Sequence, residues 1–169
     1  MEHLLTSEVI SLASRVVREN AAIGRKIALA ESCTGGLVSA AITEIPGSSD
    51  VLACGFVTYS DAAKMQLLNV NADLIDTFGA VSIAVVWAMA QGALEKGDAD
   101  VAVAISGVAG PGGGSEMKPV GTVVFAKAEK GMDPEDVVAE RKDLGADLTR
   151  AEIRQKAVLY ALELLLPSP

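Results

Sequence analysis

Alternating apolar, strand-like segments and amphipathic, helix-like segments predict an α/β fold for this chain. Its 169 residues are 50% hydrophobic, which suits a single domain with a buried core over residues 1–169. The last two strand-like segments are close enough in the sequence to pair as a hairpin. We therefore expect a three-layer α/β/α sandwich built on a mixed sheet.

The first half of the chain is predicted to alternate helices and strands. Residues 7–22 place apolar side chains at helical spacing and end near Gly24. Residues 25–31 form a buried strand in this prediction, and residues 35–45 a helix that Pro46 ends. A strand rich in β-branched and aromatic residues follows over residues 51–60, and short helices follow over 61–68 and 72–78.

The second half continues this pattern to the end of the chain. Residues 82–96 are apolar on most sides and predict a core-packed helix, followed by a strand over 100–106. Strands over 120–129 and 136–144 suit a hairpin across "KGMDPE". Thr149 and Glu152 have capping-box spacing, which predicts a last helix through Leu165.

Composition and charge exclude several classes of function. The net charge of -8 repels phosphate backbones and no run of Lys or Arg offsets it, so we expect no nucleic-acid partner. No apolar run approaches the roughly 20 residues that cross a bilayer. We therefore expect no membrane partner and a cytoplasmic location. Cys33 and Cys54 lack CxxC spacing and are expected to be free thiols.

Histidine chemistry is excluded for a similar reason. His3 is the only histidine and lies two residues from the terminus, so neither a Ser-His-Asp triad nor a histidine metal site is expected. We predict no metal and no cofactor. Any acyl transfer then needs another base.

A turn of small residues, "ESCTGG" at residues 31–36, follows the first buried strand and opens a helix. Such a turn would aim backbone N–H groups and small hydroxyls at the carboxyl edge of the sheet, where open α/β folds bind ligands. Gly35 and Gly36 would leave room for a ligand to approach. Ser32 or Thr34 could instead serve only as the helix N-cap. The turn matches neither of the usual phosphate-loop patterns.

A second glycine-rich segment, "GVAGPGGGSEMKP", lies between two predicted strands. Five of its first eight residues are glycine, which is costly in chain entropy for a mere connector. We expect both glycine segments to reach one cleft, with Ser106 facing it from the end of the preceding strand. A flexible surface loop is the alternative.

A third segment offers a base. Tyr59 ends a predicted strand, and Lys64 falls in the first turn of the next helix. The positive end of the helix and partial burial would both lower the pKa of Lys64. The neutral amine could then take a proton from a serine hydroxyl, and Tyr59 could relay it. The available serines are Ser48, Ser49 and Ser32; the alternative is an ordinary exposed lysine beside a half-buried tyrosine.

Four segments together carry a resemblance to a known family: "AESCTGGLVSAAITEIPGSSDV", "GFVTYSDAAKMQLLNV", "GAVS" and "ISGVAGPGGGSEMKPVGTV". They resemble the CinA C-terminal domain family, nicotinamide-nucleotide amidohydrolases of the PncC type. The resemblance implies metal-free deamidation of nicotinamide mononucleotide in pyridine nucleotide salvage, by a homodimer whose domain has a mainly parallel five-stranded mixed sheet. Longer members carry a further N-terminal domain, so this chain resembles the stand-alone form.

Carried over by position, the family's serine, tyrosine and lysine fall on Ser49, Tyr59 and Lys64. Ser48 is the neighbouring candidate and Ser32 the alternative nucleophile. The resemblance also implies that the two glycine segments and Ser106 hold the substrate; the glycine-segment residues are Cys33, Thr34, Gly35, Gly36, Gly110, Gly112 and Gly113.

Two positions depart from the family's patterns. Where the family tends to read "GDRxxVR", this chain has "GADLTRAEIR", in which Arg150 is the counterpart of the first arginine and suits phosphate binding. Arg154, one turn on, is interpreted as part of a solvated face. The chain also has "YSDAAK" in place of the more usual "YSNEAK".

Two other functions stay open at this point. A nonenzymatic nucleotide-binding or competence-related regulatory module would need the glycine segments but no activated lysine. A different amidase or hydrolase would use Ser32 or Cys33 as its nucleophile.

Overall fold

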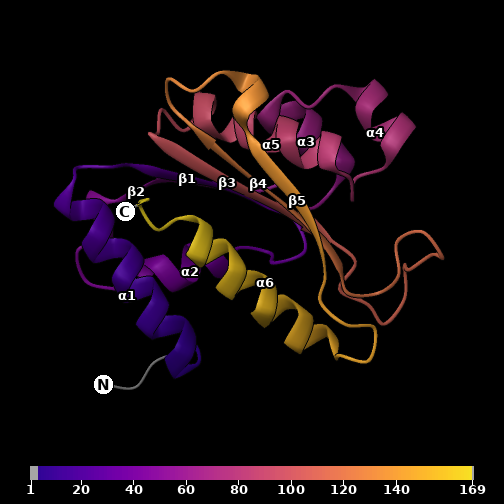
Figure 1. Ribbon diagram of the computed structural model, residues 1–169, viewed down its shortest axis with the longest axis horizontal. Coiled ribbons are helices and arrows are strands. Elements are labelled where there is room, and N and C mark those ends of the chain that lie inside the picture. Colours follow the sequence, from indigo (N-terminus) through magenta and orange to yellow (C-terminus); the bar gives the residue numbers. More distant parts are fainter. Residues whose placement is uncertain (1–3, 169) are drawn as a thin grey trace.

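A five-stranded sheet forms the centre of the chain in the computed structural model, which describes residues 4–168 (Figure 1). Its strands are β1 (Ile27–Glu31), β2 (Leu52–Val57), β3 (Val101–Gly107), β4 (Thr122–Glu129) and β5 (Val138–Asp143), in the order β2-β1-β3-β4-β5. β1 pairs in parallel with β2 and β3, whereas β4 is antiparallel to β3 and β5. The predicted mixed, mainly parallel sheet is confirmed, because four of the five strands run in one direction.

Helices cover both faces of the sheet and complete three layers (Figure 1). α1 (Ser7–Ala22), α2 (Leu37–Thr43) and α6 (Arg150–Leu164) lie on one face, and α3 (Asp61–Leu68), α4 (Ala72–Phe78) and α5 (Ile83–Lys96) lie on the other. Ile27 and Leu29 of β1 pack into the first core, while Ala28 and Ala30 pack into the second. Because β1 is buried on both faces, its first four residues are apolar without alternation, and its last residue is the buried Glu31.

Helix ends follow the local signals in the sequence. Thr149 and Glu152 form the expected capping box at the start of α6. Ser60 caps α3 by accepting a hydrogen bond from the N–H of Ala63, and Ser82 caps α5 in the same way. His3, which the sequence excluded as a base, lies outside the described residues.

Strand direction divides the sheet into two ends that matter for function. We call the end where β1, β2 and β3 finish the carboxyl end, and the end where they begin the amino end. The turn over residues 32–36, Thr58 and Tyr59, and the loop after Gly107 all follow a parallel strand and so lie at the carboxyl end. The short 3₁₀ helix Ser48–Asp50 precedes β2 and lies at the amino end.

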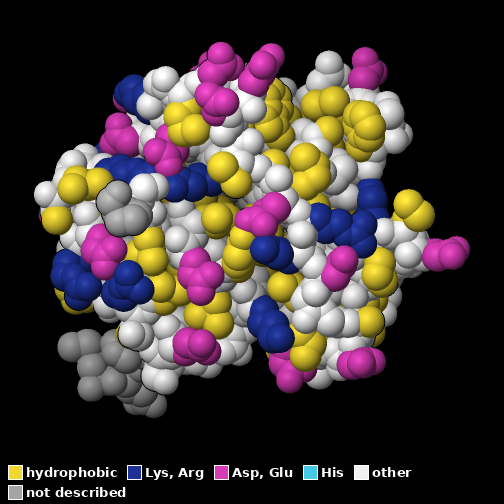
Figure 2. Space-filling view, in the orientation of Figure 1, with side chains coloured by type: hydrophobic (Ala, Val, Ile, Leu, Met, Phe, Trp, Pro, Cys, Tyr) yellow, Lys and Arg dark blue, Asp and Glu magenta, His cyan; other side chains and the backbone are white. Residues whose placement is uncertain are grey.

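The surface carries charges of both signs. On the face shown in Figure 2, Lys and Arg side chains are interspersed with Asp and Glu. None of the helices in the described part of the chain combines the length and apolarity that spanning a lipid bilayer requires.

Candidate active site

A cavity of about 200 Å³ opens at the carboxyl end of the sheet. Six segments supply its walls: the turn after β1, the residues just after β2, the start of α3, the loop before α5, the end of β3 with the loop that follows it, and the start of α6. The lining residues are Ser32, Cys33, Tyr59, Asp61, Lys64, Ala80, Val81, Ser106, Gly107, Ala109 and Arg150. Two of the three predicted segments therefore meet here as expected, and the second glycine segment reaches the cavity through its first residues.

Lys64 is the most unusual residue of this cavity because its side chain is only 1% exposed. Its Nζ lies 3.0 Å from the carbonyl oxygen of Thr58 and 3.4 Å from the Ser32 hydroxyl. Burial lowers the pKa of Lys64 below its ordinary value, while the nearby Asp61 carboxylate acts in the opposite direction. The predicted direction of the pKa shift is confirmed, and burial is its main cause. A buried amine beside a hydroxyl is the arrangement of a general base and a nucleophile.

Ser32 is held in place by the sheet. Its N–H donates to the carbonyl oxygen of Ile105 at 2.9 Å, which fixes the residue against β3 just beyond the end of β1. Its side chain is buried and faces Lys64. Ser32, named as the alternative nucleophile, is thus the serine that the structure brings to the lysine.

The placement of Ser49 and Ser48 beside Lys64 is wrong within one chain. Both residues precede β2 at the amino end, whereas Lys64 follows β2 and lies at the carboxyl end. The carbonyl oxygen of their neighbour Asp50 instead accepts a hydrogen bond from Nζ of Lys26 at 2.6 Å. A strand of six residues separates the two ends by about 20 Å.

A buried carboxylate shapes the turn that carries Ser32. Glu31 is fully buried, and its oxygens accept hydrogen bonds from the N–H groups of Gly36, Val38 and Ser39 at 2.9 to 3.1 Å and from the Ser39 hydroxyl at 2.8 Å. This carboxylate caps α2, whose N-cap residue Gly36 offers no side chain. The N-cap role considered for Ser32 or Thr34 is therefore wrong, and Glu31 occupies part of the predicted anion cradle.

Arg154 fastens the same turn from the other side. Its Nε donates to the carbonyl oxygen of Cys33 and its Nη2 to that of Thr34, both at 3.1 Å. The interpretation of Arg154 as part of a solvated face is wrong. The Thr34 hydroxyl is buried without a hydrogen-bond partner among residues 4–168, and the residue does not line the cavity.

Tyr59 and Arg150 form the outer rim of the cavity. Arg150 donates through Nη2 to the Tyr59 hydroxyl at 3.0 Å and through Nη1 to the carbonyl oxygen of Gly110 at 2.7 Å. Tyr59 is 61% exposed, so its hydroxyl stands at the mouth, while its carbonyl oxygen lies 3.4 Å from the Lys64 nitrogen. Arg150 is exposed at the first residue of α6, where an anion would be favoured.

The remaining predicted residues divide into two groups. Ser106 lines the cavity and donates to the carbonyl oxygen of Ala80 at 2.9 Å. Gly35 and Gly36 have positive φ angles of 60° and 96°, which let the turn reverse tightly, and neither belongs to the described lining. Gly112 and Gly113 are exposed and also lie outside that lining, so their predicted substrate contact is not part of this cavity.

Cys33 is a poor nucleophile in this setting. Burial raises the pKa of its thiol to about 11, and the Glu31 carboxylate contributes in the same direction. The thiol is therefore protonated at neutral pH. Ser32 is the stronger candidate at this position.

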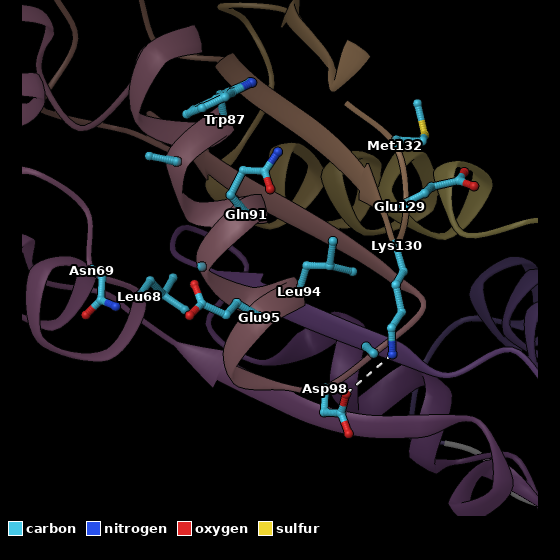
Figure 3. Close-up of a pocket in the computed structure, with 14 residues that line it drawn as sticks. Leu68, Asn69, Trp87, Gln91, Leu94, Glu95, Asp98, Glu129, Lys130 and Met132 are labelled. Carbon is cyan, nitrogen blue, oxygen red and sulfur yellow. Dashed lines mark ion pairs between the residues drawn. The ribbon is translucent and has the colours of Figure 1, made fainter. Parts of the chain in front are cut away.

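A larger cavity at the amino end provides a contrast (Figure 3). It measures about 530 Å³ and runs between α5 and the turn after β4. Its described lining contains no Ser, Thr, Tyr or Cys, and its lysine, Lys130, pairs with Asp98 at 3.5 Å, with both side chains exposed. Across residues 4–168, no three His, Cys, Asp or Glu side chains gather as a metal site would require.

Two residues of the carboxyl end were missed from the sequence as functional residues, Glu31 and Arg154. A signal for Glu31 does exist: two glycines open the next helix, so no side chain at its N-cap can satisfy the first N–H groups. Arg154 has no such signal, because its contact with the turn spans about 120 residues of sequence.

Comparisons with known proteins agree with the fold. A protein described as competence-damage inducible from Symbiobacterium thermophilum is 46% identical over 167 residues, which cover 96% of this chain and 39% of that protein. A CinA-like protein of Mycobacterium avium is 49% identical over 142 residues, which cover 84% of this chain and 32% of that protein. The chain thus spans about a third to two fifths of the length of these relatives.

Solved structures match over nearly the whole chain. The competence/damage inducible protein CihA from Agrobacterium tumefaciens superposes with a TM-score of 0.92 at 43% identity and covers 97% of both chains. A CinA superfamily protein from Escherichia coli superposes with a TM-score of 0.86 at 34% identity, and the match covers 98% of this chain and 93% of that one. The sequence pattern described as the CinA C-terminal domain matches residues 9–168. This chain therefore belongs to the CinA C-terminal domain family.

Proposed function

We propose that this chain hydrolyses the carboxamide of nicotinamide mononucleotide to nicotinate mononucleotide and ammonia. One observation carries the proposal: the buried Lys64 nitrogen lies 3.4 Å from the Ser32 hydroxyl oxygen in a cavity that Arg150 borders. The nucleophile in this scheme is Ser32, in place of Ser49. Membership of the family is compatible with a hydrolase, and the resemblance of the motifs supplies the substrate.

The first step forms a bond between Ser32 Oγ and the carboxamide carbon. Neutral Lys64 accepts the hydroxyl proton as that bond forms, and the carbonyl oxygen takes the negative charge. The C–N bond then breaks, the Lys64 ammonium returns the proton to the nitrogen, and ammonia leaves. Water hydrolyses the resulting ester, which gives the carboxylic acid and restores the Ser32 hydroxyl.

Stabilisation of the charged oxygen needs N–H donors close to Ser32. The N–H groups of Gly36, Val38 and Ser39 already bond to Glu31, so they are committed elsewhere. The N–H of Cys33, the residue directly after the nucleophile, is the donor that we propose. One well-placed donor of this kind contributes about 3 kcal/mol.

Arg150 would hold the phosphate at the rim. A cavity of about 200 Å³ is smaller than the roughly 300–1,000 Å³ of typical small-molecule sites. We therefore expect the carboxamide end to enter and the ribose phosphate to stay at the mouth. There, the guanidinium of Arg150 and the N-terminus of α6 both favour an anion.

The competing proposal is a nonenzymatic nucleotide-binding or competence-related regulatory module. It is favoured by the descriptions of the relatives as competence-damage inducible or CinA-like proteins. Such a module would bind the nucleotide at the same rim without releasing ammonia.

Incubation of the purified chain with nicotinamide mononucleotide, followed by assays of ammonia and the acid product, tests the proposal. Replacing Lys64 by Ala should lower kcat by about 10²–10⁴, the usual contribution of a positioned base, with little change in ligand affinity. Lys26→Ala is the matched control, since Lys26 also contacts a backbone carbonyl but at the amino end. Equal rates for Lys64→Ala and the unaltered chain would remove Lys64 as the base, and nucleotide binding without any ammonia release would favour the regulatory module.

We also propose that copies of the chain pair as a homodimer. β2 is an edge strand whose sequence "LACGFV" has no charge, and Val57 at its end is 48% exposed. The other edge, β5, carries charged residues over positions 140–143, which discourage pairing. Light scattering should give twice the chain mass, and Val57→Lys should shift the protein towards the monomer. A monomer at all concentrations would contradict this.

A further inference from the structure

Asp61 is the one carboxylate among the described residues that line the carboxyl-end cavity. It is the first residue of α3, directly after the N-cap Ser60 and three residues before Lys64. Side chains three apart on a helix lie on the same face. The Asp61 Oδ1 accordingly lies 3.8 Å from the Lys64 nitrogen.

The two partners of this pair differ strongly in their contact with water. The Lys64 side chain is 1% exposed, whereas the Asp61 side chain is 55% exposed. The negative charge of Asp61 thus acts on the buried amine from the side that faces solvent. Salt screens such a half-exposed charge only partly, because its partner is buried.

Groups from every neighbouring element face the Lys64 amine. The segment after β2 presents the carbonyl oxygens of Thr58 and Tyr59, and the turn after β1 presents Ser32 and the protonated Cys33.

The other charged groups nearby are engaged elsewhere. Arg150 of α6 donates to Tyr59 and Gly110, and the Glu31 carboxylate accepts the N–H groups at the start of α2. This leaves Asp61 as the carboxylate that acts on the amine directly.

Burial and Asp61 act on Lys64 in opposite senses. Burial lowers the pKa of Lys64 and is the larger cause, while the charge of Asp61 raises it. A base needs the neutral amine, whereas the contact with Asp61 favours the ammonium. The neutral fraction at a given pH therefore depends on residue 61.

We propose that Asp61 is a positioning residue that sets the proton affinity of Lys64 and so the acid limit of the hydrolysis. The catalytic part of this inference rests on the proposed function. Asp61 also orients the amine, because the carboxylate and the carbonyl oxygens of Thr58 and Tyr59 surround the same nitrogen. The variant Asp61→Asn keeps the size of the side chain and removes its charge.

The pH dependence of kcat/KM for nicotinamide mononucleotide is the first measurement. In Asp61→Asn, the amine loses its proton more readily, so the midpoint of the acid limb should move to lower pH. Each unit of movement makes the variant about tenfold faster than the unaltered chain on the acid limb. Asp61→Glu keeps the charge and should hold the midpoint near its original pH.

Asp98→Asn is the matched control for a general change in protein charge. Asp98 also pairs with a lysine, at 3.5 Å from Lys130, but at the amino end and with both side chains exposed. The Asp98→Asn variant should leave the midpoint of the acid limb of kcat/KM unchanged. Equal midpoints in Asp61→Asn and the unaltered chain, or equal shifts in Asp61→Asn and Asp98→Asn, would overturn the inference.

A second measurement needs no activity. Nuclear magnetic resonance titration of chains labelled with ¹³C at the lysine ε-carbon reports the protonation of Lys64, assigned by its loss in Lys64→Arg. The Lys64 midpoint should fall in Asp61→Asn and not in Asp98→Asn. If the chain releases no ammonia, the proposed function fails, yet this titration still decides whether Asp61 controls the amine. If the Lys64 titration midpoint is the same in Asp61→Asn and in the unaltered chain, the inference is refuted, whether or not the chain is active.

Discussion

Ser32 and Ser49 lie at opposite ends of the paired strands β1 and β2, and their surroundings differ in almost every respect. Ser32 is buried, its backbone is tied to β3, and the Lys64 amine is in contact with its hydroxyl. Ser49 is exposed in a short 3₁₀ helix beside the exposed Lys26. The same pair of residue types thus exists at both ends, but only at the carboxyl end is the lysine buried.

Under the proposed mechanism, burial of the lysine, and not the mere presence of a lysine and a serine, is what distinguishes the pair at the carboxyl end. An exposed ammonium keeps its proton at neutral pH and cannot act as a base. Cavity size does not distinguish the ends correctly either: the cavity at the amino end is larger, about 530 against 200 Å³, yet its described lining offers no hydroxyl or thiol.

Exchanging the serine at each end gives the largest expected effect. Ser32→Ala should lower kcat by about three orders of magnitude or more, because the nucleophile itself is lost. The kcat of Ser49→Ala, alone or with Ser48→Ala, should stay within about twofold of the kcat of the unaltered chain. The measurement is ammonia release from nicotinamide mononucleotide, and full activity in Ser32→Ala with loss in Ser49→Ala would reverse the comparison.

Removing an arginine from each end should separate positioning from stability. Arg154→Ala removes two hydrogen bonds from the turn that carries Ser32 and should lower kcat by roughly 10 to 100-fold through misplacement of the nucleophile. Arg25→Ala removes a 3.0 Å ion pair with Glu129 at the amino end.

Both arginine variants should lose about 1–3 kcal/mol of unfolding free energy, measured by urea denaturation. Only Arg154→Ala should lose activity while folded. If Arg25→Ala slows turnover by the same factor, the turn has no special role.

The buried lysine should also leave a signature in stability. Its pKa in the folded protein lies below the ordinary 10.5, whereas the unfolded chain keeps that value. At pH values between the folded and the unfolded pKa of Lys64, the unfolded chain holds more protons than the folded chain. The free energy of unfolding therefore rises with pH in this range. Lys64→Met has no such proton, and its stability relative to the unaltered chain should be highest at neutral pH and decline towards pH 10.5.

Urea denaturation at several pH values between 7 and 10 measures this trend, with the exposed Lys26→Met as the control. Parallel stability curves for Lys64→Met and the unaltered chain would mean that the amine is not perturbed by folding.

The two cysteines give the smallest effect. With a pKa of about 11, the Cys33 thiol is only about one part in a thousand thiolate at pH 8. Iodoacetamide should therefore label Cys33 slowly and the half-buried Cys54 first, as read by mass spectrometry of peptides. Rapid labelling of Cys33 would return it to consideration as a nucleophile.

Much of the fold could be predicted because its signals are local. Helices over 61–68 and 72–78 were predicted at the bounds that the structure has, since capping residues and breakers frame them. The hairpin that makes the sheet mixed follows from the short connection between β4 and β5.

The site was only partly predictable. The sequence correctly predicts that Lys64 and Tyr59 lie near one cavity, but the expected serine, Ser49, lies at the opposite end of β2. Strand polarity in the sequence was sufficient to avoid this error, because Ser49 precedes and Tyr59 follows the same strand. The role of Arg154 was out of reach, since it depends on how α6 packs against a turn distant in sequence.

The Glu31 carboxylate has a consequence for how a ligand is received. With three amides and one hydroxyl bound to this carboxylate, the turn that carries Ser32 is held by four hydrogen bonds before any ligand arrives. Binding of a ligand then costs little conformational entropy for ordering that turn. The site is therefore expected to be preorganised, with little induced fit. Amide hydrogens of Gly36, Val38 and Ser39 should exchange with deuterium equally slowly in the empty and the occupied protein.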